Sequence, residues 1–337
     1  MDKNLCIKSS KAVLEMNDNN AKLAIVTPED IDNLPKFIWG KNKIVHDLQE
    51  VITERTYRKG NREILIRITA AIITRTGSDG NKTIVAAFPG EREEFVDAAL
   101  RKLAVSRGDK LLNDQAGVAF TLYELREELK ATGHTYSTNE IKEALFILKN
   151  AAYECLTEQE VLLSTSFISF LSLTNADELK SDSKKQCFVQ FNPVTHKAIT
   201  GLDFNPYTYS ISMSLKSALA RIIYKKIRLF WTQTSTSQPH AINLISFLQS
   251  TPRGLTNGIQ GNKRAMESAL EALKDKDVID SWASFPVYAV ASSISGRKGK
   301  ILDYQYSIYP HPNLVKDILY SNSFKKKLKK IEKETLI

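Results

Sequence analysis

The strongest constraint on the fold lies in residues 214–309, where three helical patterns are followed by two β-rich runs. Helices are expected at 215–232, near 242–249 and at 262–277, and strands at 283–293 and 301–309. The two strands bracket a tip of Ser, Gly, Arg and Lys at 295–300. A Gly- and Asn-containing turn separates the second helix from the third. The stretch therefore predicts a small helical core closed by a β-hairpin with a cationic tip.

This order of elements is that of a winged helix, the helix-turn-helix variant whose second motif helix enters the major groove of DNA. A similar order occurs earlier in the chain. Residues 121–130 form a helical pattern, and Ser137 with Glu140 forms a capping box ahead of another. Strands are expected at 161–163, 167–173 and 187–191. Residues 62–192 thus also predict a winged-helix domain.

Before these helices, residues 62–88 predict a hairpin that turns at 77–80, and residues 91–104 predict an amphipathic helix. The whole chain is then α+β, with two tandem winged-helix domains. Its expected parts are an N-terminal arm with short helices (1–60), a first domain (61–195), a second domain (196–323) and a Lys-rich tail (324–337). In the arm, Leu34, Phe37, Ile38 and Trp39 are expected to cover a neighbouring core.

The positive charge is confined to the C-terminal third. The net charge is +9 over 337 residues. From residue 215 onward, 20 Lys and Arg stand against 9 Asp and Glu, a balance of +11, whereas residues 1–214 carry 27 against 29, a balance of −2. A localised basic excess on a helix-turn-helix pattern indicates a polyanionic partner. We expect double-stranded DNA to be that partner and the second domain to bind it.

Candidate DNA-binding residues fall in three groups. The solvent face of the 262–277 helix carries Lys263, Arg264, Glu267 and Ser268, with the two cations near its N-terminus, where such helices contact bases. The preceding turn and the hairpin tip offer phosphate contacts, from Arg253, Arg297, Lys298 and Lys300. The 215–232 helix adds Arg221, Lys225 and Arg228. A solvated amphipathic face, or basic stems packed over a core, accounts equally for these residues.

Enzymatic and membrane functions find little basis in the sequence. The three Cys and five His are dispersed, without CxxC, HxxxH or HExxH spacing, and no GxxxxGK[ST] motif occurs. Few, scattered cysteines are typical of a reducing cytoplasm. No signal-peptide pattern and no run of ~18 apolar residues is present. We expect a cytoplasmic protein without catalytic activity, cofactor, metal or membrane contact.

Several segments carry a resemblance to a known family. They are residues 88–94 (Phe-Pro-Gly-Glu-Arg-Glu-Glu) with 98–104, the helix-turn-helix at 121–150, residues 219–226, and residues 306–312. In these segments the chain resembles the plasmid replication initiator (Rep) proteins with tandem winged-helix domains. The resemblance covers residues 60–320 at the level of pattern.

The resemblance implies binding to repeated origin sites (iterons), melting of nearby AT-rich DNA, and recruitment of the host initiator and replicative helicase. It gives base contacts to Lys263, Arg264 and Ser268, and backbone contacts to Arg253 and Arg297. It gives the first domain phosphate contacts and dimerisation, with a possible homodimer. Two alternatives stay open at this point, a winged-helix transcriptional regulator and a scaffold whose basic face binds acidic proteins.

Overall fold

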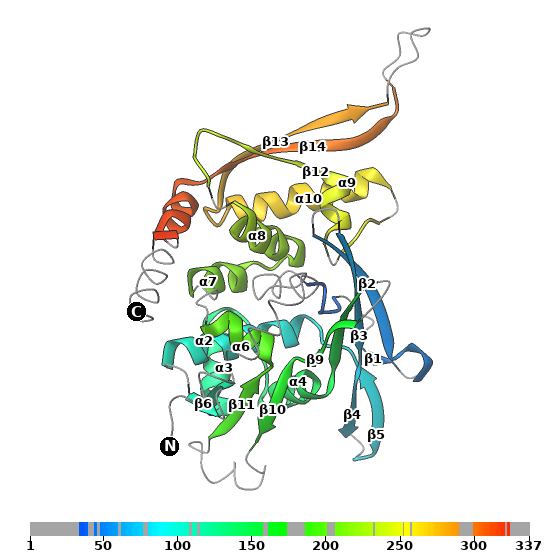
Figure 1. The fold of residues 1–337 in the computed structure, drawn as a ribbon, viewed down its shortest axis with the longest axis vertical. Helices are drawn as coiled ribbons and strands as arrows, with labels where there is room; N and C mark the ends of the chain where they lie inside the picture. Colours follow the sequence, from blue (N-terminus) through cyan, green and yellow to red (C-terminus); the bar gives the residue numbers. More distant parts are fainter. Residues whose placement is uncertain are drawn as a thin grey trace, which may run out of the picture.

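A computed structural model describes residues 34–39, 44–45, 48–59, 62–76, 80–107, 110–112, 115–157, 161–173, 186–200, 206–231, 233–251, 253–256, 258–289, 299–320 and 322–323. These residues form two units, each around its own buried apolar cluster, arranged one above the other in Figure 1. The first unit is built on the cluster that runs from Leu34 to Met213, and the second on the cluster from Leu215 to Ile318. Both combine helices with small antiparallel sheets, so the fold is mixed α+β.

Within the described residues, the first unit combines five α-helices and a 3₁₀ turn with three antiparallel sheets. Its helices are α2 (Glu91–Arg107), α3 (Leu122–Ala131), α4 (Thr138–Asn150), α6 (Pro193–Thr200), α7 (Pro206–Ser214) and the short 3₁₀ turn Leu48–Glu50. One sheet has the order β2 (Ile52–Lys59), β3 (Arg62–Thr69), β8 (Ala152–Leu156), β9 (Val161–Ser166). A second has the order β10 (Ile168–Ser172), β11 (Cys187–Phe191), β7 (Gln115–Phe120), β6 (Lys110–Leu112). The third has the order β1 (Ile44–Val45), β5 (Lys82–Ala87), β4 (Ala71–Thr76).

Local sequence signals determine where α4 begins. The Ser137 hydroxyl accepts from the Glu140 backbone N–H at 3.2 Å, and the Glu140 carboxylate accepts from the Ser137 N–H at 2.7 Å. The predicted capping box is therefore confirmed. The helix buries Ile141, Leu145 and Leu148 in the first cluster, as their helical spacing requires.

Three expectations about the first unit need correction. Residues 52–59, assigned to an arm with short helices, form strand β2, paired along its length with β3. Much of β2 is only half-buried, so the strand contains few apolar residues and the sequence pattern did not predict it. The hairpin expected to turn at 77–80 is present as β4 paired with β5, but residues 62–69, expected to belong to it, form β3 in another sheet. Residues Ile199, Tyr209 and Met213, grouped by sequence with the second domain, pack in the first cluster.

The segment 34–39 packs onto the first unit as expected. Leu34, Phe37 and Ile38 are buried, and the Ile38 N–H donates to the Pro89 carbonyl at 2.8 Å. Lys36 is also buried, with its Nζ 5.6 Å from the ring centroids of both Phe37 and Tyr153. An ammonium group at this distance from aromatic faces is attracted by their quadrupoles, which compensates part of its lost hydration.

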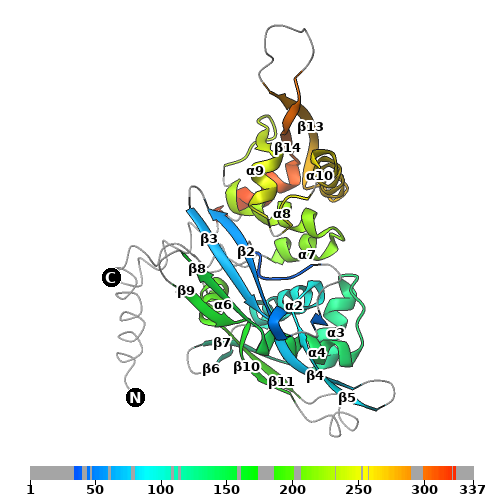
Figure 2. The same ribbon diagram turned by 90° about the vertical axis from the view of Figure 1, so that its right-hand side faces the viewer.

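The second unit places three helices against one sheet. Its elements are α8 (Ala218–Phe230), β12 (His240–Asn243), α9 (Leu244–Gln249), α10 (Ile259–Lys274), β13 (Ile279–Tyr288) and β14 (Ile301–Pro310), with a further helix over 312–320. The sheet order is β12-β14-β13, which makes β13 an edge strand. The three helices and the hairpin predicted from the sequence are all present, with ends shifted by a few residues. Figures 1 and 2 show the hairpin continuing past the helices.

The buried lysine of α8 predicts a pH dependence of stability. Lys226 Nζ donates to the Ser250 hydroxyl at 2.8 Å, and burial lowers the pKa of Lys226 to about 8. The unfolded chain keeps the ordinary pKa, near ~10.4, so the native state loses this proton first. The burial penalty is full below pH ~8 and is relieved between pH ~8 and ~10.4.

We therefore expect the free energy of unfolding of the wild type, relative to Lys226→Met, to rise by up to about 1.4 kcal/mol per pH unit in that window. Urea unfolding of both proteins across the window measures the difference. The exposed Lys274→Met is the control and should keep a curve parallel to that of the wild type. A constant difference between wild type and Lys226→Met would contradict the prediction.

Candidate nucleic-acid interface

Helix α10 buries one face and presents the other to solvent. Met266, Ala269, Leu270 and Leu273 are fully buried in the second cluster, as the helical spacing predicted. The helix begins after Gly258, whose φ of 88° lies in the left-handed region that favours glycine. A bulkier residue at this position would strain the turn that leads into the helix.

The residues predicted to contact bases lie on the solvent face of α10 but differ in how they are held. Arg264 and Ser268 are exposed. Lys263 forms an ion pair with Glu267 at 2.9 Å, and its Nζ lies 5.2 Å from the ring centroid of Tyr304. The Lys263 ammonium is therefore engaged within the protein, whereas the Arg264 guanidinium points into solvent near the N-terminal end of the helix.

Three hydrogen bonds connect α10 to the hairpin. Trp282 Nε1 donates to the Glu271 carboxylate at 3.0 Å, and the Ser284 hydroxyl donates to Glu267 at 3.4 Å. Near the start of the helix, Gln260 Nε2 donates to the Tyr304 hydroxyl at 2.9 Å. Strand β13 thus runs antiparallel to α10, and the two elements are fixed to each other at both ends of the contact. The sequence did not indicate these bonds, because each joins residues from different elements.

The turn before α10 holds Arg253 in place. Its guanidinium donates to the Asn262 side-chain oxygen at 2.9 Å and to the Thr256 hydroxyl at 3.3 Å, and Asn262 also accepts from the Thr256 N–H at 3.1 Å. Burial lowers the pKa of Arg253 below its ordinary value. Arg253 therefore shapes the turn, and its half-buried position leaves only part of the guanidinium for an external anion.

The cationic hairpin tip is described only in part. Lys300 is exposed at the start of the return strand. Arg297 and Lys298, the other two cations predicted there, lie outside the described residues.

The expected phosphate contact of Arg221 is wrong. Its side chain is only 1% exposed, and its guanidinium pairs with Glu91 at 2.5 Å and with Glu94 at 3.6 Å. It also donates to the Leu215 carbonyl at 2.9 Å. The helical spacing correctly placed Arg221 on α8. The face of α8 that carries Arg221 packs against the start of α2 in the first unit, so a phosphate cannot reach the guanidinium.

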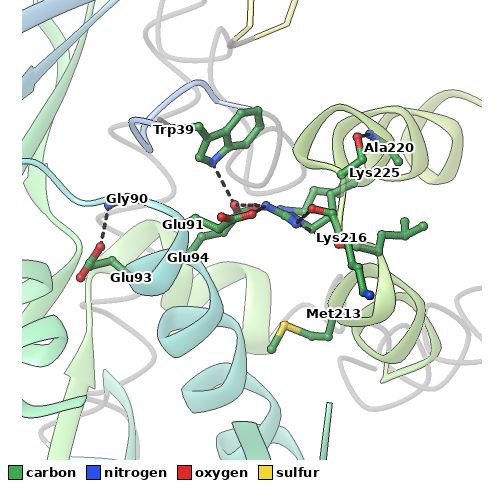
Figure 3. Close-up of polar contacts among 12 residues, drawn as sticks. Trp39, Gly90, Glu91, Glu93, Glu94, Met213, Lys216, Ala220 and Lys225 are labelled. Atoms are coloured by element: carbon green, nitrogen blue, oxygen red, sulfur yellow. Dashed lines mark hydrogen bonds and ion pairs between the residues drawn. The ribbon is translucent and has the colours of Figure 1, made fainter. Parts of the chain in front are cut away.

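The expected phosphate contact of Lys225 is wrong for the same reason. Its Nζ donates to the Glu94 carboxylate at 2.8 Å, and Trp39 Nε1 donates to the same carboxylate at 3.1 Å (Figure 3). We call Arg221, Lys225, Glu91, Glu94 and Trp39 the Arg221 cluster. Burial raises the pKa of Glu94, but the charges of Lys225 and Arg221 outweigh it and hold the pKa below its ordinary value. The cluster therefore keeps a buried carboxylate ionised between the two units. Arg228, on the same helix, is half-buried.

In the first unit, the helix that corresponds to α10 by order is α4, and a strand and a helix pack against part of its surface. Strand β4 packs against α4, with the Arg75 guanidinium paired to the Glu143 carboxylate at 2.7 Å. Arg92 of α2 pairs with the same carboxylate at 2.8 Å. The β4–β5 hairpin thus covers a face of α4 that a groove-binding helix would need to expose.

Comparisons with known proteins give a likeness of fold. No family model matches the sequence, and no curated protein matches it. A crystal structure of domain 2 and domain 3 of RctB superposes on 85% of this chain and 99% of that one, with a TM-score of 0.51 and 11% identity. The chain therefore shares the fold of those two domains.

Two further crystal structures superpose less well. A second structure of RctB domains 2-3 covers 83% of this chain and 96% of that one, with a TM-score of 0.48 and 11% identity. The Pi initiator protein in complex with iteron DNA covers 66% and 94%, with a TM-score of 0.40 and 12% identity.

None of the helices in the described ranges is long and apolar enough to cross a membrane. Among the same residues, no group of three or more His, Cys, Asp or Glu side chains is placed to hold a metal ion.

The Arg221 cluster predicts a large loss of stability when its carboxylate is neutralised. Glu94→Gln leaves two largely buried cations short of a counter-charge, which costs about 3–5 kcal/mol for a buried pair. Urea unfolding followed by Trp fluorescence measures the loss. The control is Glu154→Gln, which breaks the solvent-accessible pair with Arg67 at 3.3 Å and should cost less than about 1 kcal/mol. Equal losses in the two variants would show that the cluster adds nothing beyond a surface ion pair.

Proposed function

We propose that this chain is a sequence-specific DNA-binding initiator of plasmid replication. In this proposal it binds repeated origin sites (iterons), promotes melting of adjacent AT-rich DNA, and recruits the host initiator and replicative helicase. It acts in the cytoplasm, with no catalytic step and no cofactor of its own. The resemblance in residues 60–320 suggests this role, and the geometry of α10 is the observation that carries it.

Helix α10 supports the proposal because one of its faces is fixed to the rest of the protein while the other is exposed, as a groove-binding helix requires. Its apolar face is fixed in the second cluster, its acidic residues are hydrogen-bonded to β13, and Arg264 and Ser268 are exposed on its solvent face. In the proposed winged helix, α9 and α10 are the helix-turn-helix and β13–β14 is the wing. Arg264 is then in position for the two-bond contact that Arg makes with guanine.

The first unit fits a supporting role. Its net charge up to residue 214 is −2, and its helix α4 is covered by the β4–β5 hairpin. We propose that this unit, the first winged helix of the pair, serves dimerisation and regulation, with phosphate contacts at most. The Arg221 cluster connects it to the second unit, which carries α10.

Protection of origin DNA tests the proposal directly. Nuclease footprinting of the wild-type chain on its parent replicon should protect repeated sites beside AT-rich DNA. A failure to protect any repeat would refute the initiator role, and protection of a single promoter site would favour a transcriptional regulator.

Arg264→Ala should weaken binding to the protected repeat by about 1–3 kcal/mol and relax the base preference at one position, because one bidentate contact is lost. Titration of the repeat and of single-base variants measures both effects. The control, Lys274→Ala, changes an exposed cation at the other end of the helix and should leave base preference intact. Equal weakening on every sequence would reassign Arg264 to phosphate.

Lys300→Ala should act differently, because an exposed cation at the hairpin tip contacts phosphate and releases counterions on binding. We expect the slope of log K against log salt to fall by about 1, with base preference unchanged. Binding measured over a series of salt concentrations gives the slope. An unchanged slope would exclude this end of the hairpin from the interface.

A further inference from the structure

The first turn of α10 exposes an amide side chain that a buried tyrosine holds in place. Gln260 is exposed, and its Nε2 donates to the Tyr304 hydroxyl at 2.9 Å. Tyr304 is only 6% exposed and belongs to the second cluster. An exposed glutamine loses rotamer entropy when a ligand fixes it in one conformation. The bond to a buried hydroxyl restrains Gln260 before any ligand binds, so less entropy is lost on binding.

The bond to Tyr304 leaves Gln260 with a defined pair of hydrogen-bonding groups. A glutamine amide has two N–H donors and one carbonyl oxygen. The Tyr304 hydroxyl takes one donor, so one N–H and the oxygen remain. Adenine presents the complementary pair in the major groove, with N7 as the acceptor and the N6 amino group as the donor. The remaining groups of Gln260 therefore match the two-bond contact that glutamine makes with adenine.

Gln260 lies beside Arg264 on the exposed face of α10. Side chains four positions apart are neighbours on a helix surface, and both residues are exposed. A rise of ~1.5 Å per residue separates their Cα atoms by ~6 Å along the helix axis. Successive bases of one DNA strand are ~3.4 Å apart. Two side chains at this spacing therefore reach bases that are about one or two steps apart.

The residue after Gln260 has no side chain, although the protein leaves room for one. Gly261 is exposed within α10, and its φ does not lie in the left-handed region. Among the described residues, a Cβ at Gly261 would come no closer than 4.0 Å to another part of the chain, at the Thr256 hydroxyl oxygen. Glycine destabilises a helix relative to alanine. Backbone conformation and internal packing do not account for this glycine, whereas the close approach of a ligand does.

We propose that Gln260 is a specificity-determining residue that binds an adenine in the major groove, about one or two base-pair steps from the guanine contacted by Arg264. This inference rests on the proposed function. Tyr304 is the positioning residue for the amide. Gly261 lets the backbone of the first turn come close to the DNA, so that the Gln260 side chain reaches the edge of the base.

The test compares binding to defined duplexes. The wild-type chain selects a preferred duplex from a random-sequence library, and each base pair of that duplex is then varied singly. A further copy carries 7-deazaadenine, which lacks the N7 acceptor, in place of the predicted adenine. The variants are Gln260→Ala and Tyr304→Phe. The control is Gln238→Ala, which changes an exposed glutamine in the loop before β12.

We expect Gln260→Ala to bind the selected duplex about tenfold more weakly and to lose the preference for adenine while keeping that for guanine. The 7-deazaadenine duplex should bind the wild type more weakly than the selected duplex, but should bind Gln260→Ala equally well, because the contact is already absent. Tyr304→Phe keeps the ring and should lose about threefold, at the adenine position alone. Gln238→Ala should match the wild type. An unchanged preference for adenine in Gln260→Ala would overturn the inference.

Gly261→Ala should change stability and binding in opposite directions. Alanine favours the helix, so the midpoint of thermal unfolding should rise by about 2 °C. The added methyl group should weaken binding to the selected duplex about tenfold, because it keeps the first turn away from the base. Unchanged or tighter binding by Gly261→Ala would refute the close approach and overturn the adenine contact that depends on it.

The outcomes separate this inference from the proposed function. If the library yields no preferred sequence, the site-specific role fails, and the adenine contact fails with it. If a sequence is selected and Arg264→Ala relaxes one position, but Gln260→Ala keeps every base preference, the adenine contact alone is refuted. If Tyr304→Phe lowers the preferences for adenine and guanine alike, Tyr304 supports the helix as a whole, and its positioning role is refuted.

Discussion

The arrangement of the two units depends on one buried guanidinium. Removing an ion from water costs on the order of several kcal/mol, and the cost is recovered only with close counter-charges and hydrogen bonds. Arg221 finds them in Glu91, Glu94 and the Leu215 carbonyl. Two of these partners belong to the first unit, so separating the units would leave both signs of charge without compensation. The junction is therefore specified by electrostatics as well as by apolar packing, and a small rotation between the units would be resisted.

The same need for counter-charges divides the basic residues of the second unit into those with partners inside the protein and those that are exposed. Arg221 and Lys225 are neutralised within the protein, Arg253 shapes a turn, and Lys263 is paired along its own helix. Arg264 and Lys300 remain exposed. A basic balance in the sequence therefore overstates how many cations face a ligand. Arg264 lies on α10 and Lys300 on the hairpin that is hydrogen-bonded to α10, so the relative positions of these two cations are set by the protein before any ligand arrives.

Local signals in the sequence predicted α2, α3, α4, α8, α9, α10 and the hairpin of the second unit, because capping, turn chemistry and side-chain periodicity act over a few residues. They did not predict α6 and α7. The capping box at Ser137 is the clearest case. Long-range contacts were not predictable in this way. Glu91 stands 130 positions before Arg221, so the charge pattern of α8 alone favoured a phosphate. Strand β2 was missed because its partner strand, and not its own composition, stabilises it.

The uneven distribution of charge has a consequence for how the molecule meets a polyanion. With −2 up to residue 214 and +11 beyond it, the charge is divided unequally along the chain, which gives the protein an electric dipole. A negatively charged rod exerts a torque on such a dipole, which turns the second unit toward it before contact is made. Encounters then begin in an orientation close to the productive one, and the benefit falls once salt shortens the Debye length below the size of a domain.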